Sequence, residues 1–344
     1  MLTVLLSSGL CHAALGSDTG GSVRIPAAWT GVASIKPSYG RLSRHGLIPL
    51  VNSLDCPGLM ARSVADLGLL LDCVQGEDRL DSTSLPTQSR PMAALTDQEV
   101  GKVRVGVPQE YLCPGMEEEI VSVWSRVADL LDSAGAKVVP VSLPHTELAI
   151  PCYSVLNPCE VASNMARYDG VEYGLRGRGL STEDMFADGR ARGFNEVVRG
   201  RILAGNYFLL KRHYEEYYGQ ALRLRRMILE DFRKVWEEVD VLVTPVTLSP
   251  PPLYSEFSSV DNRTQTATQD YCTQPVNLAG LPAVTLPVSL TSSHLPVSVQ
   301  LVGRWRQDED LIKLGAWLES KLNFPTLVID PDSADVEAER RAEL

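Results

Sequence analysis

The sequence predicts an α/β protein built on a mixed β-sheet that α-helices cover on both faces. Three observations support this class. A strand pattern, a helix pattern and a second strand pattern follow one another between residues 102 and 141, and a connection of this length joins parallel strands. Residues 182–238 have a helical pattern and lead into a buried strand at 239–246. Two further strands are expected at 283–290 and 297–302.

The first element with a clear capping signal is a buried helix over residues 63–74. Ser63 is its N-cap, Asp66 follows three residues later, and a nearly continuous apolar stripe comes next. The polar, turn-rich residues 75–99 then form a surface connection. Valine occupies every second position of residues 102–107, which is the period of a strand.

The helix that follows is expected to begin at Glu117. Three glutamates occupy its first turn and apolar residues recur on one face, while Gly135 ends it before the strand at 137–141. The later stretch 182–238 includes a long amphipathic helix with four arginines. We interpret these arginines as a solvated helix face, with RNA contact as the alternative.

The C-terminal part alternates between regular elements and breaks. Three prolines at 250–252 impose an irregular loop, and residues 308–322 form a helix after the last strands. The charged residues 331–344 are expected to form a disordered tail, so a single domain is expected over residues 1–330. The sequence contains no internal repeat and no transmembrane pattern.

Composition fits a protein with a large core and argues against several classes. The 344 residues are 44% hydrophobic, and a net charge of -11 disfavours a surface that mainly neutralises phosphates. The seven cysteines are odd in number and lack a C-x-x-C motif, which indicates reduced thiols in a reducing compartment. The five histidines show no metal-ligand spacing, and we predict no structural metal.

The N-terminal residues 1–17 combine an apolar run with small residues but do not match a secretory signal. They lack a basic n-region, and Ser7, Ser8 and Gly9 interrupt the apolar run.

The strongest functional signal is LGSDTGGSVRIP at residues 15–26. Thr19, Gly20, Gly21 and Ser22 can turn successive N–H groups toward one point, because glycine permits close and unusual backbone geometry. Such a group of donors suits an oxyanion, and a serine hydroxyl beside it is placed to attack a carbonyl. Gly-Gly-Ser alone also occurs in ordinary turns, so the flanking residues decide between the two interpretations.

Those flanking residues resemble the amidase signature family. The likeness spans residues 17–49, SLDCPG at 53–58 and DSTSLP at 81–86, and covers nearly everything from about residue 10 to about residue 324. Three later runs carry it further: EVASNMARYDGVEYG, GFNEVVRGRILAGNYFLL and TQPVNLAGLPAVTLP. The resemblance implies the amidase-signature fold and makes Ser22 the acyl nucleophile. It also implies that residues 7–22 end a buried helix and enter the nucleophile loop.

Other assignments around the serine fit less well. The sequence lacks the G-x-S-x-G elbow of α/β-hydrolases, and no S-x-x-K accompanies Ser22. Lys36 is the alternative base, but the family uses its KPSYG run structurally. Arg24 is expected to brace the loop against Asp18.

Within the family, the later runs resemble the glutamine-hydrolysing subunits of tRNA-dependent amidotransferases. That likeness implies ammonia release for the conversion of Glu-tRNA(Gln) to Gln-tRNA(Gln), with B and C subunits as partners and tRNA held mainly by B. It implies that the B subunit uses ATP and Mg²⁺ and that this chain binds no cofactor and no membrane. GRILAGNYFLLK and DNRTQTATQDYCTQ resemble the mitochondrial form, so a matrix location is expected, although the chain shows no transit peptide.

Free glutamine presents an α-carboxylate and an α-ammonium beside its amide. A guanidinium fork suits the carboxylate, and a carboxylate suits the ammonium. By resemblance, Arg201 binds the glutamine carboxylate and Asp270 binds the amino group. Tyr153 lies in the neighbourhood of a further glutamine contact.

The resemblance also implies a general-base lysine and a proton-relay serine upstream of Met1. We therefore expect this chain to lack the N-terminal part of its domain, through a truncated gene model or a shortened isoform. Two other functions stay open at this point. One is another amidase-signature hydrolase of small or lipid amides, and the other is a noncatalytic subunit that only binds partners.

Overall fold

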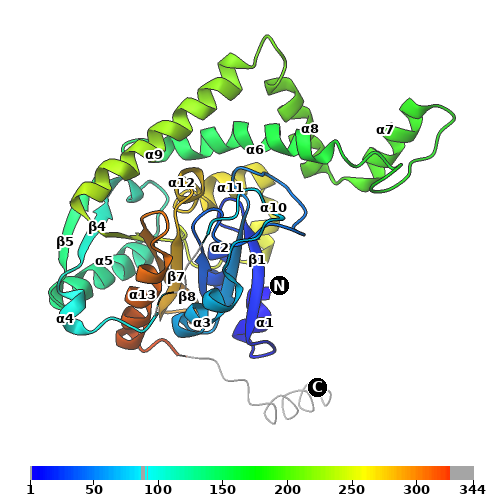
Figure 1. Cartoon of the computed structure of the whole chain (residues 1–344). Coiled ribbons are helices and arrows are strands. Elements are labelled where there is room, and N and C mark those ends of the chain that lie inside the picture. Colours follow the sequence, from blue (N-terminus) through cyan, green and yellow to red (C-terminus); the bar gives the residue numbers. More distant parts are fainter. Residues whose placement is uncertain (1, 87–89, 91, 326–344) are drawn as a thin grey trace.

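A mixed eight-stranded β-sheet forms the centre of the computed structural model, which describes residues 2–86, 90 and 92–325 (Figure 1). The strand order is β1-β3-β2-β7-β8-β6-β4-β5. Its strands are β1 (Ala13–Asp18), β2 (Ala33–Lys36), β3 (Cys56–Ala61), β4 (Arg104–Pro108), β5 (Lys137–Val141), β6 (Val241–Pro245), β7 (Ala283–Leu290) and β8 (Pro296–Gly303). Neighbours from β1 to β6 are antiparallel, whereas β6, β4 and β5 run parallel.

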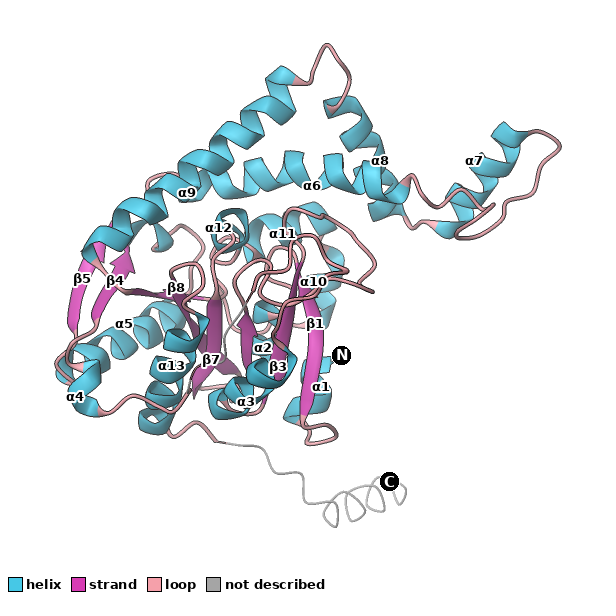
Figure 2. Cartoon of the chain, in the orientation of Figure 1, coloured by secondary structure: helices cyan, strands magenta, loops and turns pink. Residues whose placement is uncertain are grey.

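Helices cover both faces of this sheet, as predicted (Figure 2). On one face α13 (Asp308–Leu322) packs beside α3 (Val64–Val74), and Gly315 of α13 lies against Val284 and Leu301. The adjacent strand residue Gln300 points to the opposite face, where its side chain bonds Arg24 of α2 (Arg24–Thr30). Alternation along a strand places such neighbours on opposite sides, so the sheet lies between two helical layers.

A second group of helices forms an arm above one end of the sheet (Figure 1). It contains α6 (Ala149–Met165), α7 (Thr182–Gly193), α8 (Glu196–Phe208) and α9 (Gln220–Glu238), with a π-helical turn at Glu215–Gly219. The remaining helices are α1 (Leu2–Ser7), α4 (Asp97–Val100), α5 (Glu118–Ser133), α10 (Tyr254–Ser259), α11 (Asn262–Gln269) and α12 (Gln274–Ala279). The arm matters for the site because α6 and α8 lie against each other and line its pocket.

Several sequence predictions are confirmed to the residue. Strands β5 and β7 and helix α13 have the expected bounds, and Ser63 caps α3 by accepting a hydrogen bond from the Asp66 backbone N–H. Gly135 adopts φ +93° just after α5, which is the left-handed conformation that ends a helix. Strands β4 and β5 are parallel neighbours, as their connection required.

Other predictions are wrong or incomplete. Residues 7–22 do not continue a helix: α1 ends at Ser7, and β1 then leads into the loop. Strands β2 and β3 are also unpredicted, because every residue in them is buried and the alternation that marks a half-exposed strand is missing. Helix α6 escapes prediction for a similar reason, since it is buried on most sides and contains Pro158.

The predicted solvated face of α9 holds for three of its four arginines. The side chains of Arg223, Arg226 and Arg233 are 63%, 61% and 54% exposed. Arg225 is the exception, because its guanidinium bonds the backbone oxygens of Leu278 and Ser53 and so ties α9 to the sheet domain. The predicted tail at 331–344 lies outside the described residues.

Candidate active site

The nucleophile loop joins β1 to α2, and a buried ion pair fixes its two ends. Asp18 at the end of β1 and Arg24 at the start of α2 are both fully buried, with Arg24 Nη2 3.0 Å from Asp18 Oδ1. Burial opposes ionisation of Asp18, but the Arg24 guanidinium holds its pKa below the ordinary value. The predicted brace between these residues is therefore confirmed.

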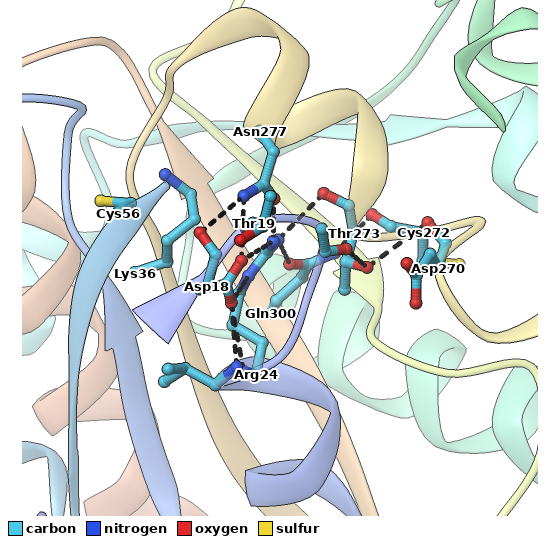
Figure 3. A network of polar contacts seen from close by, with 12 residues as sticks. Asp18, Thr19, Arg24, Lys36, Cys56, Asp270, Cys272, Thr273, Asn277 and Gln300 are labelled. Atoms are coloured by element: carbon cyan, nitrogen blue, oxygen red, sulfur yellow. Dashed lines mark hydrogen bonds and ion pairs between the residues drawn. The ribbon is translucent and has the colours of Figure 1, made fainter. Parts of the chain in front are cut away.

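This ion pair sits in a wider network beneath the loop (Figure 3). Arg24 Nη1 donates to the Thr273 carbonyl at 3.2 Å and to Gln300 Oε1 at 3.1 Å, and its Nη2 also bonds Asn277 Oδ1. Asn277 Nδ2 donates to the backbone and side-chain oxygens of Asp18. A movement of the loop would break this network and leave a buried charge unpaired, which is strongly destabilising. The loop is therefore held in place.

The two glycines of the loop are required by close packing. Gly21 has φ +143°, and a Cβ there would collide with Thr273 and would lie 2.6 Å from Ile25 Cδ1. A Cβ on Gly20 would collide with the Gln274 amide and would lie 2.9 Å from Asp270 Oδ2. A larger residue at either position would force the loop away from the segment that carries Asp270.

Hydrogen bonds anchor the loop on both sides of these glycines. Thr273 Oγ1 donates to the Gly20 carbonyl at 2.5 Å, and Thr19 Oγ1 donates to Asp55 Oδ1 at 2.7 Å. Asp55 Oδ2 accepts the backbone N–H groups of Leu50 and Val51, each at 2.8 Å. The loop is held by carbonyls and side chains, which leaves its own N–H groups available.

Those N–H groups are the candidate oxyanion donors of the loop. Within the described ranges, the backbone N–H groups of Gly20, Gly21 and Ser22 donate to no acceptor. Ser22 itself is exposed, and its hydroxyl makes no hydrogen bond to any described residue. An accessible hydroxyl beside free amide donors can attack a carbonyl and stabilise the resulting oxyanion.

Asp270 lies against this loop, directly after α11. Its carboxylate contacts the Gly20 backbone, and the described part of the chain offers that carboxylate no hydrogen bond. Burial raises the pKa of Asp270 to about 7, and Asp18 adds to the rise while Arg24 and Arg201 oppose it. A desolvated carboxylate without a partner is suited to bind a cation.

Tyr153 and Arg201 face a pocket of about 800 Å³ between α6, α8 and α11. Arg201 is half-buried and its Nη2 donates to Asn262 Oδ1 at 3.1 Å, while the buried Tyr153 hydroxyl accepts from Asn157 Nδ2 at 2.7 Å. The pKa of Tyr153 is raised, mainly because the side chain is buried. The charge of Arg201 opposes this rise, and the charge of Asp270 adds to it. The structure thus places the three predicted substrate residues within electrostatic reach of one another.

Lys36 does not belong to this site. It is 1% exposed, and its Nζ donates to the neighbouring Pro37 carbonyl at 2.9 Å rather than to Ser22. Burial disfavours the charged form of both Lys36 and Cys56. It therefore lowers the pKa of Lys36 and raises the pKa of the Cys56 thiol to about 11. This geometry agrees with the structural role expected for the KPSYG run.

Several residues of the site were not predicted. Asp55 lies in the SLDCPG run, and Thr273, Gln274 and Asn277 lie in the TQPVNLAGLP run, so their motifs were noticed but their roles were not. Gln300 belongs to no noticed motif and meets Arg24 only because β8 passes beneath the loop. Asp55, Thr273, Gln274 and Asn277 share one signal in the sequence: each is a polar residue within a run of buried residues.

Neither a metal centre nor a membrane-spanning helix is found in the described ranges. No three His, Cys, Asp or Glu side chains there come together as a group able to hold a metal ion. No helix of the described part combines the length and the apolar character needed to cross a bilayer.

The fold and the loop place this chain in a known class. The profile of the family described as Amidase matches residues 3–312, so the chain belongs to the amidase family. Its relatives include the A chain of the mitochondrial glutamyl-tRNA(Gln) amidotransferase of Anopheles gambiae, 51% identical over 323 residues, covering 93% of this chain and 66% of that protein. The Homo sapiens protein of the same name is 49% identical over 344 residues, covering 98% of this chain and 65% of its own length.

Solved structures show the same fold. The corresponding glutamyl-tRNA(Gln) amidotransferase chain of Thermotoga maritima superposes with a TM-score of 0.76 and 31% identity, covering 95% of this chain and 68% of that one. A 6-aminohexanoate cyclic dimer hydrolase has a TM-score of 0.75 at 23% identity, which shows the fold alone. The chain spans slightly less than two thirds of the length of the curated relatives, 66% and 65% in the two cases above.

Proposed function

We propose that this chain carries the glutamine-hydrolysing site of a tRNA-dependent amidotransferase. One observation supports this most directly: the unpaired Asp270 carboxylate lies against the loop of Ser22, while Arg201 lies within electrostatic reach of both Asp270 and Tyr153. An ammonium-binding carboxylate and a carboxylate-binding guanidinium are the two groups that free glutamine requires.

In the proposed reaction, Ser22 Oγ attacks the side-chain carboxamide carbon of glutamine. The N–H groups of Thr19, Gly20, Gly21 and Ser22 stabilise the tetrahedral oxyanion, and ammonia then leaves. Water attacks the acyl-serine ester, and the bond to Ser22 Oγ breaks to release glutamate. The Ser22 proton passes to a base and from that base to the departing nitrogen, so that the C–N bond breaks with release of ammonia. The family resemblance implies that this base is a lysine acting through a relay serine.

The ammonia is used elsewhere in the proposed complex. We propose a B subunit that activates Glu-tRNA(Gln) with ATP and Mg²⁺ and converts it to Gln-tRNA(Gln), with a C subunit completing a heterotrimer. The relatives named above are mitochondrial, which supports a place for this protein in the mitochondrial matrix. The net charge of -11 supports tRNA being held mainly by the B subunit.

A form of the protein extended upstream and assembled with its partners tests the nucleophile. Ser22→Ala should lower glutamine hydrolysis by several orders of magnitude, with assembly unchanged, because the exposed hydroxyl contributes no packing. Covalent labelling by a glutamine analogue with an electrophilic γ-carbon should disappear in parallel. Labelling of the alanine variant at the normal rate would assign the nucleophile to another residue.

Substrate choice separates this proposal from its alternatives. A hydrolase of small or lipid amides would turn over an apolar amide as well as glutamine, and it would have no use for Arg201 and Asp270. Equal kcat/KM for glutamine and for an unsubstituted fatty amide would therefore contradict glutamine specificity. A noncatalytic subunit would bind partners yet give neither turnover nor covalent labelling.

A further inference from the structure

Gln274, the first residue of α12, carries a buried amide that no described residue satisfies. Its side chain is 0% exposed, and neither Nε2 nor Oε1 has a hydrogen-bond partner within the described ranges. Buried polar side chains are nearly always hydrogen-bonded, so this amide requires an explanation. Its backbone N–H donates to the Asp270 carbonyl at 2.8 Å, which places the two side chains one helical turn apart.

The Gln274 amide and the Asp270 carboxylate both approach Gly20 of the nucleophile loop. A Cβ built on Gly20 would collide with Gln274 Oε1 and would lie 2.9 Å from Asp270 Oδ2. Because Gly20 has no Cβ, Gln274 Oε1 and Asp270 Oδ2 can both approach its Cα from the same side. Two acceptors form a hydrogen bond only when one of them carries a proton.

The surroundings of Asp270 allow both protonation states near neutral pH. The groups that face it are Asp18 of β1, Arg24 of α2, Arg201 of α8 and Tyr153 of α6. Burial outweighs the two arginines and raises the pKa of Asp270 to about 7. A neighbouring side chain that can hydrogen-bond only one of these two forms would therefore lose its bond in the molecules that carry the other form.

A primary amide suits both forms. Its oxygen accepts from the protonated carboxyl, and a half-turn of the amide group brings Nε2 to the same place, where it donates to the ionised carboxylate. The half-turn exchanges two groups of nearly equal size, so the buried packing around Gln274 is kept. In the structure Oε1 is the polar atom of the amide nearest to Gly20, on the side where Asp270 Oδ2 also lies, and this orientation fits the protonated carboxyl.

We propose that Gln274 is a positioning residue that hydrogen-bonds the Asp270 carboxyl in both protonation states and holds it against the nucleophile loop, where the α-ammonium of the substrate binds. The identity of that substrate rests on the proposed function. The inferred hydrogen bond involves only residues of this chain, so it can be tested without substrate.

The first test measures the Asp270 titration by carboxyl ¹³C NMR on the 344-residue chain, with the resonance assigned through Asp270→Asn. Gln274→Met keeps the side-chain size and removes both polar atoms. The charge-assisted bond to the ionised carboxylate is the stronger of the two bonds that are lost, so the pKa of Asp270 should rise by about 1. Gln98→Met on the exposed helix α4 is the matched control and should leave the titration unchanged. An identical Asp270 titration in the wild type and in Gln274→Met would overturn the proposal.

A second measurement needs no variant at Gln274 and so covers the case in which Gln274→Met does not fold. The side-chain ¹⁵N–H₂ resonances of Gln274 should titrate with the same midpoint as the Asp270 carboxyl. That titration should vanish in Asp270→Asn. Gln274 side-chain chemical shifts that do not change with pH in the wild type would contradict the inferred hydrogen bond.

Kinetics on an upstream-extended form separate a positioning role from a merely structural one. Gln274→Met should raise KM for glutamine about tenfold at pH 7 with little change in kcat, and glutaramate, which lacks the α-amino group, should be unaffected. Equal losses with both substrates would overturn a role through Asp270. A wild-type protein that uses no glutamine at all would instead contradict the proposed function, while the NMR result would still stand.

Discussion

Ser22 and Arg24 are two residues apart and occupy opposite environments. Ser22 is exposed and its hydroxyl has no partner among the described residues, whereas Arg24 is fully buried and each nitrogen of its guanidinium group donates to a described acceptor. The difference follows from their chemistry. A nucleophile must reach its substrate, and a buried guanidinium is tolerated only when its charge is paired and its donors are satisfied.

The proposed roles of Arg201 and Asp270 lead to a prediction about the nitrogen donor. In the assembled complex, Arg201→Ala and Asp270→Asn should each lower kcat/KM for glutamine on the order of a hundredfold, because each removes a charge-paired contact to substrate. Amidation with free ammonia should continue at nearly the wild-type rate, since ammonia bypasses this site. Parallel losses with glutamine and ammonia would remove both residues from the glutamine site.

The titration of Asp270 predicts a pH dependence with a definite sign. Burial raises its pKa in the folded chain to about 7, from an ordinary value of 3.8, so the folded state holds the proton more tightly than the unfolded state. The contribution of Asp270 to the stability of the ligand-free chain should therefore fall as pH rises from about 4 to about 7 and then level off. Asp270→Asn should remove that slope in urea unfolding measured across this range.

Glutamine binding should show the opposite trend, because the ammonium needs the ionised carboxylate. The dissociation constant should fall roughly fivefold between about pH 6 and about pH 7, roughly tenfold in all by about pH 8, and become nearly constant above that. Isothermal titration calorimetry at several pH values measures this directly. A dissociation constant that is flat across the range would mean that Asp270 is not the ammonium partner.

At the scale of elements, the close contact between α6 and α8 depends on Gly205. A Cβ at that position would collide with the Pro158 carbonyl and would lie 2.9 Å from Ala162 Cβ, so backbone meets backbone at this crossing. The contact positions Tyr153 on α6 opposite Arg201 on α8 across the pocket. The geometry of this pocket thus depends on a residue that is not among its lining residues.

This predicts contrasting effects for two identical substitutions on α8. Gly205→Ala should destabilise the chain by about 1–3 kcal/mol, because the crossing helices must separate. Gly200→Ala is the matched control: nothing lies within 4 Å of its Cβ position, and alanine favours the helix by about 1 kcal/mol over glycine. Urea unfolding of both variants measures the difference, and equal effects would argue against tight packing at Gly205.

At the scale of the whole molecule, the arrangement predicts how active the 344-residue chain is. No described residue hydrogen-bonds the Ser22 hydroxyl, and a serine without a base is a weak nucleophile. We expect glutamine hydrolysis by these 344 residues to be far below that of a form that also carries the lysine and relay serine that the family resemblance implies. Ammonia release measured for both forms with the B and C subunits tests this, and comparable turnover would show that a base exists within this chain.

Much of the architecture could be predicted from local patterns. The helix at Asp308–Leu322 and the strands at Lys137–Val141 and Ala283–Leu290 have the expected bounds, because capping residues, turn residues and apolar periods act over a few neighbouring positions. The loop of the proposed nucleophile could also be located from the sequence, since Ser22 and its glycines lie inside a continuous motif. The pairing of Arg24 with Asp18 was inferred because six residues separate them.

The support beneath the loop was decided only by the tertiary structure. Gln300 hydrogen-bonds Arg24 across 276 residues of sequence, and Asn277 hydrogen-bonds Asp18 across 259. The close approach of Gln274 to Gly20 depends on α12 packing against the loop. The buried strands β2 and β3 carry no alternation, so their place in the sheet also depends on partners far along the chain. Local sequence sets propensity and periodicity, but which distant polar groups share a buried site follows only from the packing of the sheet and its helices.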